Sequence, residues 1–288
     1  MNPIRSMASS KSPDFVLAAE FQDILHVWDL NTQSSAATMA ANFDFGGERV
    51  AQSNDGQIIY CAAYQRYGVS AYNRADGSLI WNRRDLKKCQ VVRIADDDTG
   101  IWCAFDDGPM QYLDRVDGRT ILSLRGVRDI CVSPYQPLRL QENKKHCELV
   151  RIGSEKVIKI PTETFAVLSM TFAPGFVIFS QAGGATRCLN VETGTEIWRR
   201  QEADSHCLQL GYSEADQAVL SIWRRLKGVC DYHFSALDVA TGEEKVRALV
   251  TDSTDFTFCR NGQLLVCSNG DAMDTSTCKT NFSFLSQT

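Results

Sequence analysis

Ser235-Ala-Leu-Asp-Val-Ala-Thr-Gly242 is one copy of a motif that recurs along this 288-residue chain and decides its fold. In each copy, residues of alternating character precede an Asp or Asn, two variable residues follow, and the motif ends in Thr-Gly, Asp-Gly or a variant of them. Four further copies and a weaker final one occupy the ranges His26–Gln33, Ser70–Gly77, Gln111–Gly118, Arg187–Gly194 and Asp271–Cys278. Repetition of this kind indicates a fold built from similar units.

The spacing of the copies gives the number of units. The Asp or Asn residues lie 44, 41, 76, 48 and 36 residues apart, and they are Asp29, Asn73, Asp114, Asn190, Asp238 and Asp274. The interval of 76 residues spans about two periods, and Leu149–Ile160, around Gly153, is an eroded copy near its middle. We therefore expect seven units of about forty residues each.

Each copy has the chemistry of a β-hairpin turn. A short Asp or Asn side chain accepts hydrogen bonds from the backbone just ahead of it, and a glycine four residues later supplies the positive φ of a tight turn. A second turn lies upstream of each copy, as at Ser53–Gly56 and Arg260–Gly262, between alternating apolar runs. Two hairpins per unit give four strands, so the sequence predicts an all-β fold: a single β-propeller of seven four-stranded blades.

One local pattern favours a helix instead. Between Glu20 and Leu30, apolar residues recur at helical spacing. Equivalent segments of other units contain Gly68, Gly108 and Gly184, which disfavour a helix interior. Because the register of the repeat outweighs a single window, we predict a strand here.

Composition excludes several classes of partner. Apolar residues make up 44% of the chain and charged residues 23%, with a formal net charge of -5. So mild a negative charge does not favour nucleic-acid or anionic-membrane binding. The first residues lack the apolar core of a secretory signal, and no apolar run of about eighteen residues occurs. We expect a cytoplasmic protein, monomeric on its own, with no nucleic-acid or membrane partner.

Metal and nucleophile signatures are weak. The eleven cysteines are scattered without a Cys-x-x-Cys pair, so we expect reduced thiols used as small buried hydrophobic residues. The four histidines show no metal-binding spacing, and we expect no metal and no cofactor. Asp96–Asp98 resembles part of a calcium site, but a solvated hairpin tip is the simpler interpretation. His206 and Cys207, adjacent on a strand, should point to opposite faces, which disfavours a Cys–His nucleophile.

Several residues resemble known propeller repeats. Trp28-Asp29 resembles the Trp-Asp end of a WD repeat, and Ser235–Gly242 resembles the Ala-x-Asp-x-x-Thr-Gly core of quinoprotein-like (PQQ-type) repeats. In that repeat a Trp commonly follows four residues after the glycine, and two units match: Gly77 with Trp81, and Gly194 with Trp198. The resemblance implies the propeller fold. It does not imply quinone chemistry, because the adjacent Cys-Cys pair of the quinoprotein dehydrogenases is missing.

Function should lie in what differs between the units. In a propeller, the loops after the second and fourth strands of each blade open on one face, and the loop Arg224–Cys230 lengthens the sixth unit. Tyr, Trp and Arg are enriched at binding hot spots. We therefore predict that a protein partner is bound by Tyr64, Arg66, Tyr67, Asp106, Asp107, Trp223, Arg224, Arg225 and Lys227. The same predicted face includes Gln65, Lys144, Lys145 and His146.

The inner strands distinguish two functions. We place them at Arg49–Gln52, Val91–Ile94, Asp129–Val132, Ser169–Phe172, Cys207–Leu210 and Phe256–Cys259. These segments contain few titratable residues, which disfavours catalysis in the central channel. We expect a non-enzymatic protein-interaction module, and one version is an immunity-type inhibitor of a toxin or enzyme. The alternative is a lactonase-like hydrolase of small substrates acting at the central channel.

Closure of the ring has two possible forms. The first unit, from Phe15 onward, lacks an inner strand. Either residues of Met1–Ser12 supply it, or the final strand, Asn281–Leu285, fastens the ring in another register. Closure matters because an open ring would leave two exposed sheet edges. We place a flexible N-terminal segment at residues 1–13 and the propeller at residues 14–288.

Overall fold

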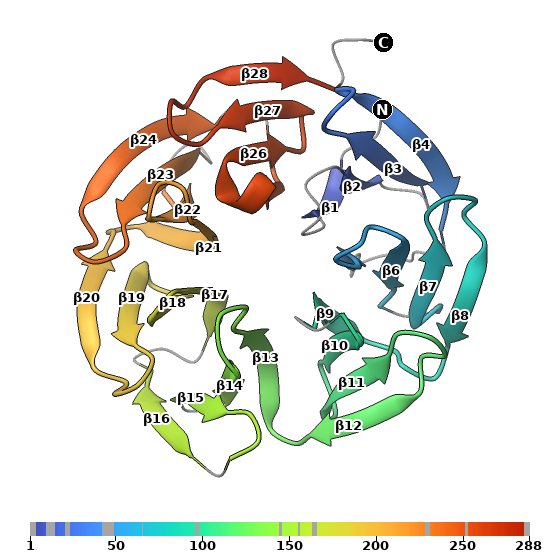
Figure 1. The fold of residues 1–288 in the computed structure, drawn as a ribbon, viewed down its shortest axis with the longest axis horizontal. Coiled ribbons are helices and arrows are strands. Elements are labelled where there is room, and N and C mark those ends of the chain that lie inside the picture. The colour runs from blue at the N-terminus through green and yellow to red at the C-terminus, as the bar shows by residue number, and fades with distance from the viewer. Residues whose placement is uncertain are drawn as a thin grey trace.

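The computed structural model of the chain is a seven-bladed β-propeller, a ring of seven four-stranded antiparallel sheets (Figure 1). It describes residues 4–9, 15–20, 24–41, 49–64, 66–95, 98–143, 146–154, 156–162, 166–227, 231–250 and 253–284. The first strand of each blade lies next to the central channel and the fourth lies at the rim (Figure 1). The predicted fold class and the predicted number of blades are confirmed.

Each blade is made of four strands that are consecutive in the sequence. The first three blades are β1 (Ile4–Ser9), β2 (Phe15–Glu20), β3 (Ile24–Asp29) and β4 (Ser34–Ala40); β5 (Arg49–Gln52), β6 (Ile58–Ala62), β7 (Val69–Asn73) and β8 (Leu79–Arg83); and β9 (Cys89–Ile94), β10 (Gly100–Phe105), β11 (Met110–Asp114) and β12 (Thr120–Leu124). The fourth and fifth are β13 (Val127–Val132), β14 (Leu138–Asn143), β15 (His146–Arg151) and β16 (Val157–Pro161); and β17 (Val167–Ala173), β18 (Phe176–Gln181), β19 (Ala185–Asn190) and β20 (Glu196–Gln201). The last two are β21 (Ser205–Ser213), β22 (Ala218–Arg225), β23 (Tyr232–Asp238) and β24 (Glu244–Val250); and β25 (Phe256–Cys259), β26 (Leu264–Cys267), β27 (Asp271–Asp274) and β28 (Thr280–Ser283), with the 3₁₀ turn η1 (Arg260–Gly262) after β25.

The repeated motif forms the hairpin between the third and fourth strands. At Asn190 the side-chain Oδ1 accepts the backbone N–H two residues on at 2.9 Å, and its carbonyl oxygen accepts the N–H of Gly194 at 2.8 Å. Gly194 has a φ of 71°, as the turn requires. Where the first and last copies lack glycine, Gln33 and Cys278 each adopt a φ of 56°. The hairpin predicted from the motif is therefore confirmed.

The two ambiguous segments are strands. The eroded copy around Gly153 is the hairpin of β15 and β16, so it belongs to a complete fourth blade. The segment with helical spacing near Trp28 is β3, which pairs with β2 and β4. The six predicted inner strands all lie within first strands of blades, from β5 to β25.

Packing between the first and last blades closes the ring. Strand β1 pairs with β2 as the inner strand of the first blade, so the predicted boundary at residue 13 is wrong for Ile4–Ser9. Strand β28 is the outer strand of the last blade, and the alternative of a final strand in another register is wrong; Leu285 lies outside the described residues. Trp28 stacks on Phe284 with ring centroids 4.8 Å apart, and Arg260 Nη2 donates to the Leu30 carbonyl at 3.1 Å.

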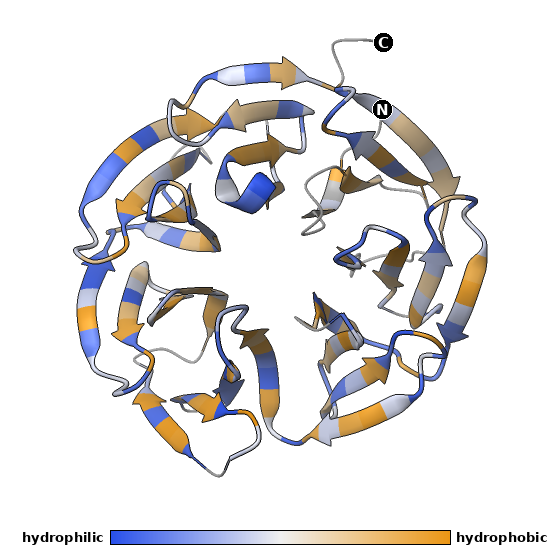
Figure 2. Ribbon diagram, viewed as in Figure 1, coloured by the Kyte–Doolittle hydropathy of each residue, from blue (hydrophilic) through white to orange (hydrophobic). Residues whose placement is uncertain are grey.

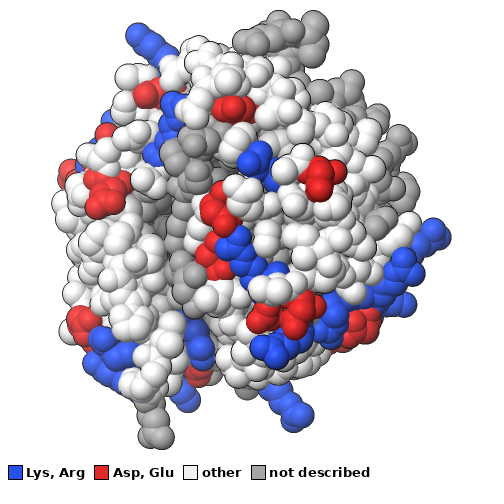
Figure 3. All heavy atoms as spheres, turned by 45° about the vertical axis from the view of Figure 1, so that its right-hand side comes forward, with Lys and Arg blue, Asp and Glu red and all other residues white. Residues whose placement is uncertain are grey.

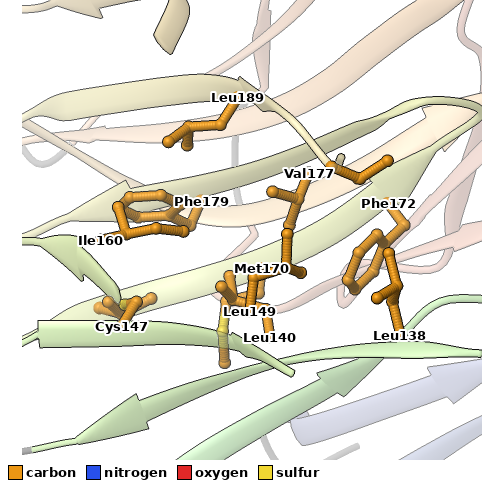
Figure 4. Packing of buried hydrophobic residues seen from close by; sticks show 12 residues of the cluster. Leu138, Leu140, Cys147, Leu149, Ile160, Met170, Phe172, Val177, Phe179 and Leu189 are labelled. Carbon is orange, nitrogen blue, oxygen red and sulfur yellow. The ribbon is translucent and has the colours of Figure 1, made fainter. Parts of the chain in front are cut away.

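The core lies in layers between neighbouring blades. Between the fourth and fifth blades, Leu140 and Phe179 are fully buried in one apolar cluster (Figure 4). Hydrophobic residues occupy strands of every blade, while hydrophilic residues alternate with them along the outer strands (Figure 2). This alternation is expected where one side of each strand packs and the other faces water. All ten cysteines that the structure describes are free, and most are buried.

A tryptophan on the fourth strand locks two pairs of blades together. Trp81 lies over Gly118 of the next blade and donates from Nε1 to a backbone carbonyl there at 2.9 Å. Trp198 lies over Gly242 in the same way, with a 2.8 Å hydrogen bond. A Cβ at either glycine would lie 2.7 Å from the ring, so only glycine permits this approach. No helix in the described residues is long and apolar enough to cross a membrane.

Candidate binding face and central channel

The two faces of the propeller carry different loops. We call the linker face the one formed by the loops between second and third strands together with the connections between blades. The hairpin face carries the loops between first and second strands and between third and fourth strands. Because strands alternate in direction, this division follows from the order of strands in each sheet. Eight of the nine predicted partner-binding residues belong to loops or strand ends at the linker face, and the ninth, Trp223, lies within β22.

Four of the predicted residues come together with a lysine between the second and third blades. The Tyr64 hydroxyl donates to the Asp106 carboxylate, which raises the pKa of Tyr64. Lys88 Nζ lies 2.8 Å from Asp107, and its backbone N–H donates to the carbonyl of Tyr64. Tyr67 continues the same loop and accepts a hydrogen bond at its carbonyl from Asn82. The cluster is polar and exposed, with acidic and basic groups already paired.

The predicted residues of the sixth blade lie on the opposite side of the ring from this cluster (Figure 1). Arg224, Arg225 and Lys227 are exposed at the end of β22. Lys227 Nζ lies 2.8 Å from Asp204, and Arg225 is 3.8 Å from Asp231. The structure therefore forms two groups on one face, not one continuous patch.

Trp223 is not a surface residue. Its side chain is fully buried, its Nε1 donates to Ser221 Oγ at 2.9 Å, and its ring stacks on His233. The prediction that Trp223 contacts a partner is wrong because the residue belongs to the core between the fifth and sixth blades. Of the other residues assigned to this face, Arg66 is exposed, His146 pairs with Glu148, and Gln65, Lys144 and Lys145 lie outside the described residues.

Ion pairs on the outside of the molecule join neighbouring blades. Acidic and basic side chains lie next to one another on the side shown in Figure 3. Arg115 of the third blade makes such a contact with Asp55 of the second blade at 2.5 Å, and it also contacts Asp98 of its own blade at 2.5 Å. Asp98 is thus held by an arginine; Asp96 and Asp97 lie outside the described residues. The described residues contain no group of three or more His, Cys, Asp or Glu placed to hold a metal ion.

The central channel holds charged groups of two predicted inner strands together with Glu142, which the sequence did not indicate. A cavity of about 440 Å³ at its linker-face end is lined by residues of the inner strands of all seven blades. Arg93 of β9 contacts Asp129 of β13 at 2.9 Å, which raises the pKa of the arginine. Glu142 of β14 lies directly opposite Asp129 in the strand pairing, beside a register shift. The channel is therefore less apolar than predicted.

Glu142 is a carboxyl group whose pKa the surroundings in this channel shift strongly. Burial raises its pKa to about 7, with a further contribution from the negative charge of Asp129. Its Oε1 accepts the backbone N–H of Val167 from the next blade at 3.1 Å, which acts in the other direction. A carboxyl group that exchanges its proton near neutral pH suits acid–base chemistry or pH-dependent binding.

Replacement of Glu142 by glutamine should stabilise the protein at pH 8 and have a much smaller effect on its stability at pH 5. The unfolded carboxyl ionises from its ordinary pKa of 4.5, whereas the folded one ionises near 7, so stability falls as pH rises between these values. The glutamine is neutral throughout. With about 1.4 kcal/mol for each pKa unit, and allowing for partial screening by solvent, the expected gain at pH 8 is about 2 kcal/mol. Urea unfolding at both pH values measures it.

Glu148→Gln is the matched control on the neighbouring strand. Burial alone would raise the pKa of Glu148, but hydrogen bonds from His146 and Gln141 lower it overall. Its replacement should therefore destabilise the protein by similar amounts at pH 8 and at pH 5, because both lie above the ordinary pKa of 4.5 and this contribution is lost only at lower pH. Equal effects of Glu142→Gln at the two pH values would show that Glu142 does not have a raised pKa.

His206 and Cys207 do not form a nucleophilic pair. His206 Nδ1 accepts the backbone N–H of Gly183 at 3.1 Å. Cys207 is buried, and burial raises the pKa of its thiol to about 12, so the thiolate is disfavoured at neutral pH.

Comparison with known proteins adds no relative: no protein-family model matches the chain, and no curated protein matches it. The fold and the geometry of the channel and faces are thus the basis for assigning a function.

Proposed function

We propose that this chain is a non-enzymatic interaction module that binds a protein partner through its linker face. The supporting observation is the hairpin of β21 and β22, whose strands of 9 and 8 residues are the longest described. At the linker-face end of β22, Arg224, Arg225 and Lys227 surround Leu226 in the sequence, and the side chain of Leu226 is 48% exposed. An exposed aliphatic side chain among basic groups suits a partner with an acidic rim around an apolar pocket.

The rigidity of the ring supports this role. Blades locked by tryptophans and by inter-blade ion pairs present their loops in fixed positions, so little ordering entropy is lost on binding. We further propose that the protein acts as a monomer in the cytoplasm, and that it works as an antidote by covering the site of a toxin or enzyme. Similarity of its hairpins to WD and quinoprotein-like repeats fits this proposal only at the level of architecture.

Replacement of Arg224, Arg225 and Tyr67 by alanine should reduce capture of the partner at least tenfold in affinity pull-downs from native lysate. All three side chains are at least partly exposed, so the melting temperature should change little. Arg119→Ala is the matched control, because Arg119 is an exposed arginine of the hairpin face. Capture that is unaffected by the triple substitution would refute binding at the linker face.

A second candidate function is hydrolysis of a small substrate in the central channel. The observation in its favour is Glu142, whose pKa burial raises to about 7, beside the ion pair of Arg93 and Asp129. Glu142 would serve as general base and Arg93 would position an anionic group. Hydrolysis requires that the pKa of Glu142 be raised, which the unfolding of Glu142→Gln at two pH values tests. If the two pH values give equal effects, Glu142 does not have the pKa that a general base in the channel needs.

A further inference from the structure

The interface between the third and fourth blades lacks the tryptophan lock. Trp81 and Trp198 each lie opposite a third-strand residue next to a shift in strand register. Leu122 has the same place in the third blade, opposite Tyr112 and next to the equivalent shift. Leu122 is 42% exposed, whereas both tryptophans are 8% exposed. Because leucine is smaller than tryptophan, Leu122 covers less of the neighbouring blade than Trp81 and Trp198 do.

The facing turn of the fourth blade is uncovered as well. Gly118 and Gly242 each lie against a tryptophan of the preceding blade. Gly153 lies in the corresponding turn of the fourth blade, two residues closer to the end of the third strand than Gly118 and Gly242 lie in theirs, and among the described residues no atom lies within 4 Å of the position of a Cβ there. Gly153 is therefore not covered by a described side chain of the third blade.

A groove occupies the space that the lock would fill. It has a volume of about 700 Å³ and opens near the hairpin face, beside the loop between β13 and β14. Its apolar walls are Trp102, Tyr112 and Leu122 of the third blade and Val132, Tyr135 and Ile152 of the fourth. This volume and lining are typical of sites for small organic ligands.

Arg139 lines the groove, and the charge of Glu148 acts on it without an ion pair between the two among the described residues. Arg139 of β14 donates from Nε to Gln141 Oε1 at 3.2 Å, and it makes no ion pair with the described residues. The nearby Glu148 is engaged by Gln141 at 2.7 Å and by His146 at 2.8 Å. Burial lowers the pKa of Arg139, although an arginine remains charged at neutral pH. A half-buried guanidinium of this kind gains most from an anion that pairs with its free nitrogen atoms.

We propose that the groove between the third and fourth blades binds a small apolar molecule carrying a single carboxylate. The apolar body lies between Trp102, Leu122 and Ile152, and the carboxylate pairs with the Arg139 guanidinium. The ligand class comprises medium-chain fatty acids and aromatic carboxylic acids. The site is independent of the proposed partner, because it opens near the hairpin face, opposite the linker face.

Two fluorescent probes of similar shape separate the apolar and charged contributions. Anilinonaphthalene sulfonate carries an anionic group in place of the carboxylate, and N-phenyl-1-naphthylamine carries none. We expect the intact protein to bind both, and decanoate to displace the anionic probe at concentrations where decanol does not. Arg139→Gln should weaken binding of the anionic probe and of decanoate at least tenfold and change binding of the neutral probe less than twofold.

Leu122→Trp tests the location by filling the groove as Trp81 and Trp198 fill theirs. It should weaken both probes at least tenfold. Ile80→Trp is the matched control, because Ile80 is 41% exposed on the fourth strand of the second blade, outside the groove. The Ile80→Trp variant should bind both probes as tightly as the unchanged protein does.

Three results would overturn the proposal: no binding of either probe to the unchanged protein, equal loss of both probes in Arg139→Gln, or unchanged binding of both probes in a folded Leu122→Trp variant. Should Leu122→Trp fail to fold, the comparison of the two probes in Arg139→Gln decides alone. Melting temperatures of all variants identify such a failure.

Discussion

Deletion of residues 280–288 should lower the stability of the propeller by about 5 kcal/mol or more and its melting temperature by about 10 °C. The deletion removes β28 from the last blade and with it Phe284, which is 4% exposed and stacks on Trp28 of the first blade. Among the described residues no strand is exchanged between these blades, so side-chain packing and the hydrogen bond from Arg260 to Leu30 hold the ring closed. Loss of this packing exposes the joined surfaces of both blades to water.

A shorter deletion provides the control. Removal of residues 285–288 alone takes away none of the described contacts and should leave the melting temperature unchanged. Phe284→Ala should by itself reproduce most of the stability loss seen in the longer deletion, about 3–5 kcal/mol, if the stacked rings of Trp28 and Phe284 are the main contact that closes the ring. Calorimetry measures all three. A longer deletion that melts with the intact chain would show that the ring is closed elsewhere.

The sequence predicts the blades well because their hairpins are local. The Asp or Asn, the residue at positive φ and the strands on either side lie within about a dozen residues, so their hydrogen bonds are readable from spacing. Closure is different. It depends on Trp28 meeting Phe284, more than 250 residues away in the chain, and no local pattern links them.

The candidate sites were less accessible to sequence analysis. Trp223 follows a buried strand into a basic loop, and only the inter-blade packing shows that it faces the core. Glu142 lies on a second strand, opposite Asp129 and beside a register shift, and yet it lines the channel. Such a shift moves a side chain without leaving a mark in the hydrophobic pattern. The sequence shows leucine at position 122, where two other blades have tryptophan. The groove that results can be recognised only in the structure, where Gly153 of the next blade is also left open.

Replacement of Trp198 by alanine should destabilise the protein by about 3–5 kcal/mol, whereas Leu122→Ala should cost less than about 1 kcal/mol. The two residues hold the same place in the strand register. Trp198 is buried over Gly242 and hydrogen-bonded to the next blade at 2.8 Å, so its removal leaves a cavity and breaks that hydrogen bond. Leu122 is already exposed to the groove, so little packing is lost.

Urea unfolding measures the loss of unfolding free energy in Trp198→Ala, Leu122→Ala and Trp81→Ala. The comparison shows whether any side chain at this strand position contributes strongly to stability, or only a tryptophan. We expect Trp81→Ala to resemble Trp198→Ala, because Trp81 covers Gly118 in the same way. A large loss in Leu122→Ala would mean that the third and fourth blades are held by the same packing as the others. Leu122 would then contribute as much packing energy as the two tryptophans do, and the open groove beside it would not reflect weaker packing between the third and fourth blades.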